Sequence, residues 1–186
     1  MTVEPIRDKA KIYQMYTILN QKDIKYGLLL KFGLNTGLRI SDILPVKLKD
    51  VCTDNGNFHD YFKLNEKKTG KAKKIKINTA LRKEIETFVK AEKPASGSYL
   101  FSNGKGMHIG RVQAYRVLKE AAEYADIENF GTHSLRKTWG YWTYKMSKYN
   151  IGLIMDTFNH SSPGITLRYI GINQDQKDEL YSLVQF

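Results

Sequence analysis

The chain has 186 residues, which is enough for one domain with a substantial core and short for two. Its 30 Lys and Arg residues against 19 Asp and Glu residues give a formal net charge of +11. This charge fits a polyanionic partner about as well as a generally basic soluble protein, and among polyanionic partners it favours nucleic acid over a membrane. The single cysteine, Cys52, excludes an internal disulfide and a Cys-based zinc site. The sequence shows no signal peptide and no apolar run near the roughly 18 residues of a membrane span, so we expect a soluble, cytoplasmic protein.

The first forty residues predict two helices and a sharp corner. Apolar spacing indicates helices over 6–20 and 23–36, and the second ends at Gly37, a residue that readily takes the positive φ of a helix C-terminus. A short helix restarts at once over 38–45, with Pro45 tolerated in its first turn. Arg39 is therefore held at a rigid corner, and by itself an ion pair with Asp42 is the favoured interpretation of this arginine.

A lysine-rich β-hairpin follows. Residues 61–66 and 73–77 have the composition of strands, and 69–72 joins them. A solvated strand face accounts for most of the lysines, although a hairpin tip is well suited to carry one lysine into a site. The predicted fold class is mainly α with a small antiparallel β-hairpin.

Two further helices are expected in the middle of the chain. Residues 79–93 form one, capped by Thr79, and residues 109–125 form another. Arg111 and Arg116 lie on the exposed side of the second helix, where they suit a nucleic-acid backbone, and an ordinary charged face fits them equally well.

The last third concentrates residues that suit an anion. Thr132 is a good N-cap, and on the helix after it His133 and Arg136 emerge from one face of the first turn. Backbone N–H groups and the positive end of the helix dipole lie there too.

Two more helices and a C-terminal one complete the chain. Residues 151–158 have a core-facing stripe, and His160 follows at a junction before Ser162 and Pro163 cap the short helix that carries Tyr169. A capped amphipathic helix is expected over about 174–185.

Together these blocks resemble the tyrosine recombinase (phage integrase) family, and in particular its short members that consist of the catalytic domain alone. The blocks that carry the resemblance occur in the family's order and with similar gaps, at 36–44, 68–70, 133–136, 159–163 and 166–170. The residue before His160 is Asn159, where the family more often has Gly. The resemblance implies a single catalytic domain over 1–186 without the N-terminal helical domain of most members.

The resemblance assigns six catalytic positions, and no cofactor or metal. They are Arg39, Lys68, His133, Arg136, His160 and Tyr169. Lys67 and Lys71 are near alternatives to Lys68. With Arg111 and Arg116, these two lysines are also candidate DNA contacts.

The chemistry of these residue types agrees with the implied roles. A tyrosine phenol has a pKa of about 10, so as a nucleophile it needs cationic surroundings and a proton acceptor such as His133. Two arginines can each fork onto the non-bridging oxygens of a phosphate, and His160 can donate a hydrogen bond to it. Lys68 would protonate the departing 5′-oxygen, which leaves Tyr169 joined to the 3′-phosphate.

The expected activity is site-specific DNA recombination for integration, inversion or excision, with double-stranded DNA as partner and a nucleoid-associated location. Self-association on DNA is expected, either through the C-terminal helix or with that helix packed on its own domain, and accessory DNA-binding proteins are candidate partners. A type IB topoisomerase and a catalytically silent DNA-binding regulator are the alternatives.

Overall fold

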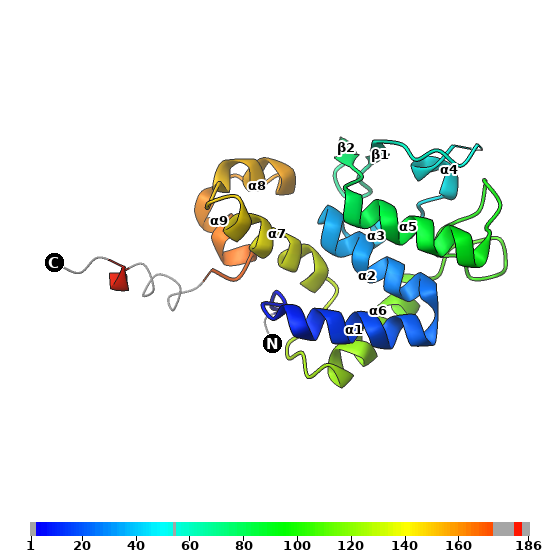
Figure 1. The fold of residues 1–186 in the computed structure, drawn as a ribbon. Helices are drawn as coiled ribbons and strands as arrows, with labels where there is room; N and C mark the ends of the chain where they lie inside the picture. The colour runs from blue at the N-terminus through cyan, green and yellow to red at the C-terminus, as the bar shows by residue number, and fades with distance from the viewer. Residues whose placement is uncertain (1–2, 54, 173–180, 184–186) are drawn as a thin grey trace.

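The computed structural model describes residues 3–53, 55–172 and 181–183, and it confirms the predicted class, mainly helical with one small antiparallel sheet (Figure 1). The helices are α1 (Lys9–Lys22), α2 (Ile24–Thr36), α3 (Ile40–Ile43), α4 (Leu48–Val51), α5 (Thr79–Glu92), α6 (Arg111–Tyr124), α7 (Ser134–Met146), α8 (Ile151–Phe158) and α9 (Pro163–Tyr169). The strands are β1 (Tyr61–Asn65) and β2 (Ala72–Lys76). Most of the helix expected over 174–185 lies outside the described residues.

The first two helices form largely as the sequence predicts. Asp8 caps α1, since its carboxylate accepts hydrogen bonds from the amides of Ala10 and Lys11, and this cap explains why the helix starts later than residue 6. α2 ends at Gly37, which has φ 62°, as predicted for a glycine at this position.

Three local predictions around helix ends were wrong. α3 ends at Ile43, so Pro45 lies beyond the helix and not in its first turn, and the short helix α4 that follows was not predicted. The cap of α5 is Asn78, one residue before Thr79, because the Asn78 side chain accepts a hydrogen bond from the amide of Leu81.

The start of α7 also differs from the prediction. His133, and not Thr132, is the N-cap residue, and its side chain makes no capping hydrogen bond. The turn is closed instead by Ser134, whose hydroxyl accepts a hydrogen bond of 3.0 Å from the amide of Gly131. The His133 side chain is therefore available for other contacts.

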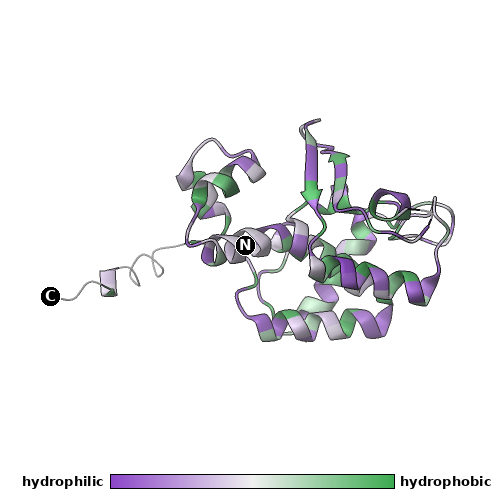
Figure 2. Cartoon of the chain, turned by 45° about the horizontal axis from the view of Figure 1, so that its top comes forward, coloured by the Kyte–Doolittle hydropathy of each residue, from purple (hydrophilic) through white to green (hydrophobic). Residues whose placement is uncertain are grey.

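The buried apolar side chains form two clusters that α7 connects. The larger includes side chains from α1, α2, α5 and α6, and Leu135 of α7 belongs to it. The smaller includes Tyr141, Ile154 and Phe158. In Figures 1 and 2, α8 and α9 accordingly lie apart from the other helices, with α7 leading to them.

The hairpin lies beside the larger cluster and turns polar residues outward. β1 and β2 pair antiparallel, with Tyr61 opposite Lys76 and Asn65 opposite Ala72. Phe62 is buried in the core, whereas the strands carry hydrophilic residues along their exposed sides (Figure 2). The turn between the strands, 66–71, holds the motif lysines.

Candidate functional site

Arg39 lies at the corner between α2 and α3, as the sequence predicts. Its Nη1 lies 3.0 Å from Oε1 of Glu66, which directly follows β1, and 3.9 Å from Oδ2 of Asp42. The predicted pair with Asp42 therefore exists, but Glu66 is the closer partner. Only 17% of the Arg39 side chain is exposed, so its orientation is largely fixed by these carboxylates.

A cavity of about 590 Å³ opens beside Arg39. The residues that line it come from the α3 corner, the hairpin turn, α6 and the start of α7, and those with charged or imidazole side chains are Arg39, Lys67, Lys68, Arg111 and His133. The cavity is thus lined by cations, which suits a phosphate group.

Arg136 enters the site from α7, and it is buried, with 3% of its surface exposed. Its Nη1 donates a hydrogen bond of 2.6 Å to the carbonyl oxygen of Gly37, and its guanidinium lies over the ring of Phe158 at 4.3 Å. Its Nη2 is buried and has no hydrogen-bond partner among the described residues. Because buried donors are nearly always paired, this nitrogen is a position where a ligand oxygen would be stabilised.

Tyr169 lies at the end of α9 between two histidines. Its hydroxyl is 3.3 Å from Nδ1 of His133, and its ring centroid is 5.1 Å from that of His160. His160 is itself held by α9, since its Nδ1 lies 3.0 Å from the hydroxyl of Thr166. The tyrosine and the histidines therefore converge as the sequence predicts.

The charges of the two arginines act on the pKa of the Tyr169 phenol. Burial raises the pKa of Tyr169 above its ordinary value, and the charges of Arg136 and Arg39 offset only part of that effect. The Tyr169 hydroxyl lies near enough to Arg136 for the guanidinium to act on the phenol's pKa. The phenol is therefore protonated near neutral pH and needs a proton acceptor.

The histidines are suited to that need. Burial lowers the pKa of His133 and of His160, and the neighbouring charges of Arg136 and Arg39 lower both further. A neutral imidazole is the form that accepts a proton. The geometry points to His133 as the acceptor, because its Nδ1 is the atom that approaches the phenol.

The hairpin lysines differ in their surroundings. Lys67 and Lys68 are exposed and line the cavity, and the Lys68 charge is near enough to contribute to the lowered pKa of His133. Lys71 instead donates a hydrogen bond of 2.9 Å to Oδ1 of Asn159. Of the three candidates, Lys71 is the one directed toward α8 rather than into the cavity.

The candidate DNA contacts on α6 also separate. Arg111 and Arg116 are both exposed, as predicted. Arg111 lines the cavity, whereas Arg116 is not among its lining residues.

Two residues with a place in this arrangement were not singled out from the sequence. Glu66 and Lys73 form a buried ion pair at 3.0 Å, next to Arg39. Lys73 is one of several lysines in the hairpin with no feature that distinguishes it, and nothing in the sequence pattern marks the Glu66 side chain as buried.

Asn159 explains the departure from the family's glycine. It is the C-cap of α8 with φ 57°, the left-handed conformation that glycine adopts most easily and asparagine better than most other residues.

Among the described residues, no group of three or more His, Cys, Asp or Glu side chains could hold a metal ion. No helix in the described ranges is long and apolar enough to cross a membrane.

Comparison with known proteins identifies this arrangement. The model of the phage integrase family matches residues 7–176. The chain belongs to that family. It is 42% identical over 182 residues to a probable integrase/recombinase, YoeC, of Bacillus subtilis, covering 97% of this chain and 96% of that protein. It is 24% identical over 164 residues to the tyrosine recombinase XerH of Helicobacter pylori, covering 84% of this chain but only 43% of XerH.

Solved structures agree with the recombinase fold. The XerA recombinase superposes with a TM-score of 0.75 at 15% identity, covering 99% of this chain and 66% of that one. XerH bound to its palindromic difH substrate gives 0.71 at 18% identity, covering 97% and 53%. The catalytic domain of bacteriophage HP1 integrase gives 0.64 at 21% identity, covering 90% and 86%. The predicted family, fold and enzyme class, a tyrosine recombinase, are confirmed, and neither the topoisomerase nor the silent regulator is favoured.

Proposed function

We propose that this recombinase cuts and rejoins DNA strands through a covalent bond between Tyr169 and a 3′-phosphate. The observation that supports this most is the approach of the Tyr169 hydroxyl to Nδ1 of His133, at 3.3 Å, beside the unpaired buried nitrogen of Arg136. Nucleophile, base and a phosphate-binding donor are then within one site.

In the forward step, the phenolic oxygen bonds to phosphorus while the bond from phosphorus to the 5′-oxygen breaks. The phenolic proton passes to His133, and Lys68 supplies a proton to the departing 5′-oxygen. The phosphotyrosine conserves the energy of the broken linkage, so attack by another 5′-hydroxyl rejoins the strand with no further energy source.

Arg39, Arg136 and His160 stabilise the charge that grows on the non-bridging oxygens. Both arginines are fixed before DNA arrives, Arg39 by its carboxylate partners and Arg136 by the carbonyl of Gly37. Donors that need no rearrangement at the moment of reaction stabilise the transition state most effectively.

DNA and a second copy of the chain are the proposed partners. XerH has been solved bound to difH, and λ integrase as a dimer on a core site and a tetramer on a Holliday junction. The basic cavity and the net charge of +11 are consistent with the same partners here. We propose that residues 1–186 act as one catalytic domain, with DNA contacts from Lys67, Arg111 and, at the margin of the site, Lys71 and Arg116.

The test is covalent trapping. Nicked duplexes tiled across the DNA that flanks the gene are incubated with the protein and separated on a denaturing gel. The native chain should form an adduct attached to the 3′-phosphate, and Tyr169→Phe should form none. Tyr149→Phe removes the same hydroxyl from an exposed tyrosine outside the site and should leave the adduct unchanged. An adduct that persists in Tyr169→Phe would refute the proposal.

A further inference from the structure

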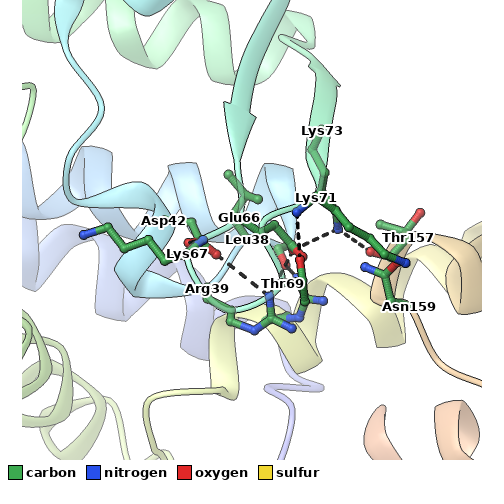
Figure 3. A network of polar contacts seen from close by, with 12 residues as sticks. Leu38, Arg39, Asp42, Glu66, Lys67, Thr69, Lys71, Lys73, Thr157 and Asn159 are labelled. Atoms are coloured by element: carbon green, nitrogen blue, oxygen red, sulfur yellow. Dashed lines mark hydrogen bonds and ion pairs between the residues drawn. The ribbon is translucent and has the colours of Figure 1, made fainter.

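A buried carboxylate connects three parts of the site. The side chain of Glu66 is fully buried, and its Oε1 lies 3.0 Å from Nη1 of Arg39 and 3.0 Å from Nζ of Lys73. Its Oε2 accepts a hydrogen bond of 2.8 Å from the hydroxyl of Thr69, which lies in the turn that carries Lys68 (Figure 3). One acid thus contacts both the α3 corner and the hairpin turn.

Lys73 extends this connection to α8. Its Nζ also donates a hydrogen bond to the carbonyl oxygen of Thr157, in the last turn of that helix (Figure 3). Lys71 makes a second link from the hairpin by its hydrogen bond to Asn159. Both contacts lie immediately before His160, so the hairpin is attached to the segment that positions this histidine.

The partners of Glu66 hold its carboxylate in the charged form. Burial would raise the pKa of Glu66, but hydrogen bonds from Thr69 and Lys73 and the charges of Lys73 and Arg39 outweigh it and lower the pKa, so the carboxylate is ionised at neutral pH. With Asp42, whose Oδ2 lies 3.9 Å from Nη1 of Arg39, the group contains two cations and two carboxylates. Nη1 of Arg39 donates a hydrogen bond to Glu66, and Arg39 also lines the basic cavity where a phosphate would bind.

We infer that Glu66 and Lys73 are positioning residues. They hold Arg39 and the segment before His160 in fixed positions, so that Arg39 and His160 reach the same phosphate. This inference rests on the proposed function. It assigns Glu66 an effect on catalysis through Arg39 rather than a direct contact with DNA. Removal of one buried partner from such a group leaves the other charge uncompensated, and its side chain is then free to take other rotamers.

The experiment compares two DNA substrates that differ in one charge. The duplex selected by trapping is made with an ordinary phosphodiester at the scissile position, or with a methylphosphonate, in which a methyl group replaces one non-bridging oxygen and removes the negative charge. On the phosphodiester, Glu66→Gln and Lys73→Met should slow adduct formation by about tenfold or more, as loss of supporting residues does in metal sites. On the neutral substrate, where a well-oriented Arg39 is no longer needed to stabilise charge, both should react close to the wild-type rate.

Lys74→Met is the matched control. Lys74 is the next residue on β2, and its Nζ lies over the ring of Tyr61 at 4.0 Å, away from Glu66. This variant loses the same charge and should match the wild type on both substrates.

The outcomes separate positioning from simple stability. Equal slowing on both substrates, or wild-type rates on the phosphodiester, would overturn the inference. Thermal unfolding is measured in parallel, and if Glu66→Gln does not fold, Lys73→Met decides alone. A wild-type chain that forms no adduct would refute the proposed function itself, whereas unaffected variants of an active chain would refute only the role of Glu66 and Lys73.

Discussion

At the scale of single residues, Arg136 is a tightly constrained side chain of the site. It is 3% exposed, one of its nitrogens donates to the carbonyl of Gly37, and another has no partner within the described part of the chain. A lysine at this position has neither the planar fork nor a second donor directed at the same point. The arginine is thus suited to a role that lysine cannot fill.

Arg136→Lys should therefore separate binding from cleavage. Loss of one donor to a developing oxyanion typically costs on the order of 3 kcal/mol, which corresponds to a rate of adduct formation lower by about two orders of magnitude. Binding at low salt, measured by fluorescence anisotropy with a labelled duplex, should persist because many phosphate contacts remain. Equal loss of binding and cleavage would show that Arg136 is needed only for the folded structure.

The lowered pKa of His133 gives a prediction for pH. Burial and the charges of Arg136 and Arg39 disfavour the imidazolium, so in the protein without DNA the ring should stay neutral until the pH falls below its ordinary value of about 6.5. The check is an NMR titration of its ring proton. Arg39→Gln should move the midpoint upward for both His133 and His160, since it removes a cation near each. A midpoint at or above the ordinary value in the native chain would contradict the electrostatics described here.

At the scale of elements, Gly37 lies at a point where the end of α2 and α7 approach closely. A Cβ on Gly37, which has φ 62°, would come within 2.5 Å of Cε3 of Trp139, and the carbonyl of this glycine also holds Arg136. The left-handed turn, the packing of α7 and the orientation of the arginine are therefore linked.

Gly37→Ala should lower the free energy of unfolding by more than the conformational strain alone, which is about 1–2 kcal/mol. Gly104→Ala is the control, because Gly104 has φ 77° and open space around its Cα, so it carries the strain without the clash. Urea unfolding of both variants measures the difference. Equal losses would show that α7 does not need this close approach.

The sequence predicted these elements unevenly, for physical reasons. Periodic apolar residues and the left-handed Gly37 predicted α2 and its end, and the apolar stripe over 151–158 lies on α8. The N-cap at His133 was missed because Thr132 and Ser134 are both good capping types, and the choice depends on tertiary contacts. The roles of Glu66 and Lys73 follow from pairing across the hairpin, which no local pattern in the sequence specifies.

At the scale of the whole molecule, the site lies where the two apolar clusters meet. Leu135 belongs to the larger cluster, and Phe158, which lies against Arg136, belongs to the smaller one. Arg39 lies beside the helices of the larger cluster, and Tyr169 lies on α9 beside the smaller cluster. The six residues of the family motif could be found from the sequence, but their convergence depends on how α7 joins the clusters.

The net charge of +11 makes a prediction for DNA binding. Affinity should fall steeply with salt, because each phosphate neutralised by a lysine or arginine releases counterions and adds about 0.9 to the slope of log affinity against log salt. Arg111→Gln should reduce that slope by about 1, since Arg111 lines the basic cavity. Lys90→Gln, on an exposed position of α5 outside the cavity, is the control. An unchanged slope in Arg111→Gln would exclude this contact.

The measurement that tests the central claim most directly is the identity of the residue joined to DNA. The trapped adduct is digested with a protease and a nuclease, and the peptide that carries the residual nucleotide is sequenced by mass spectrometry. The nucleotide should be attached to Tyr169, the tyrosine that lies against His133 and near Arg136. Attachment to another of the 12 tyrosines, or to a serine, would contradict the assignment of the nucleophile.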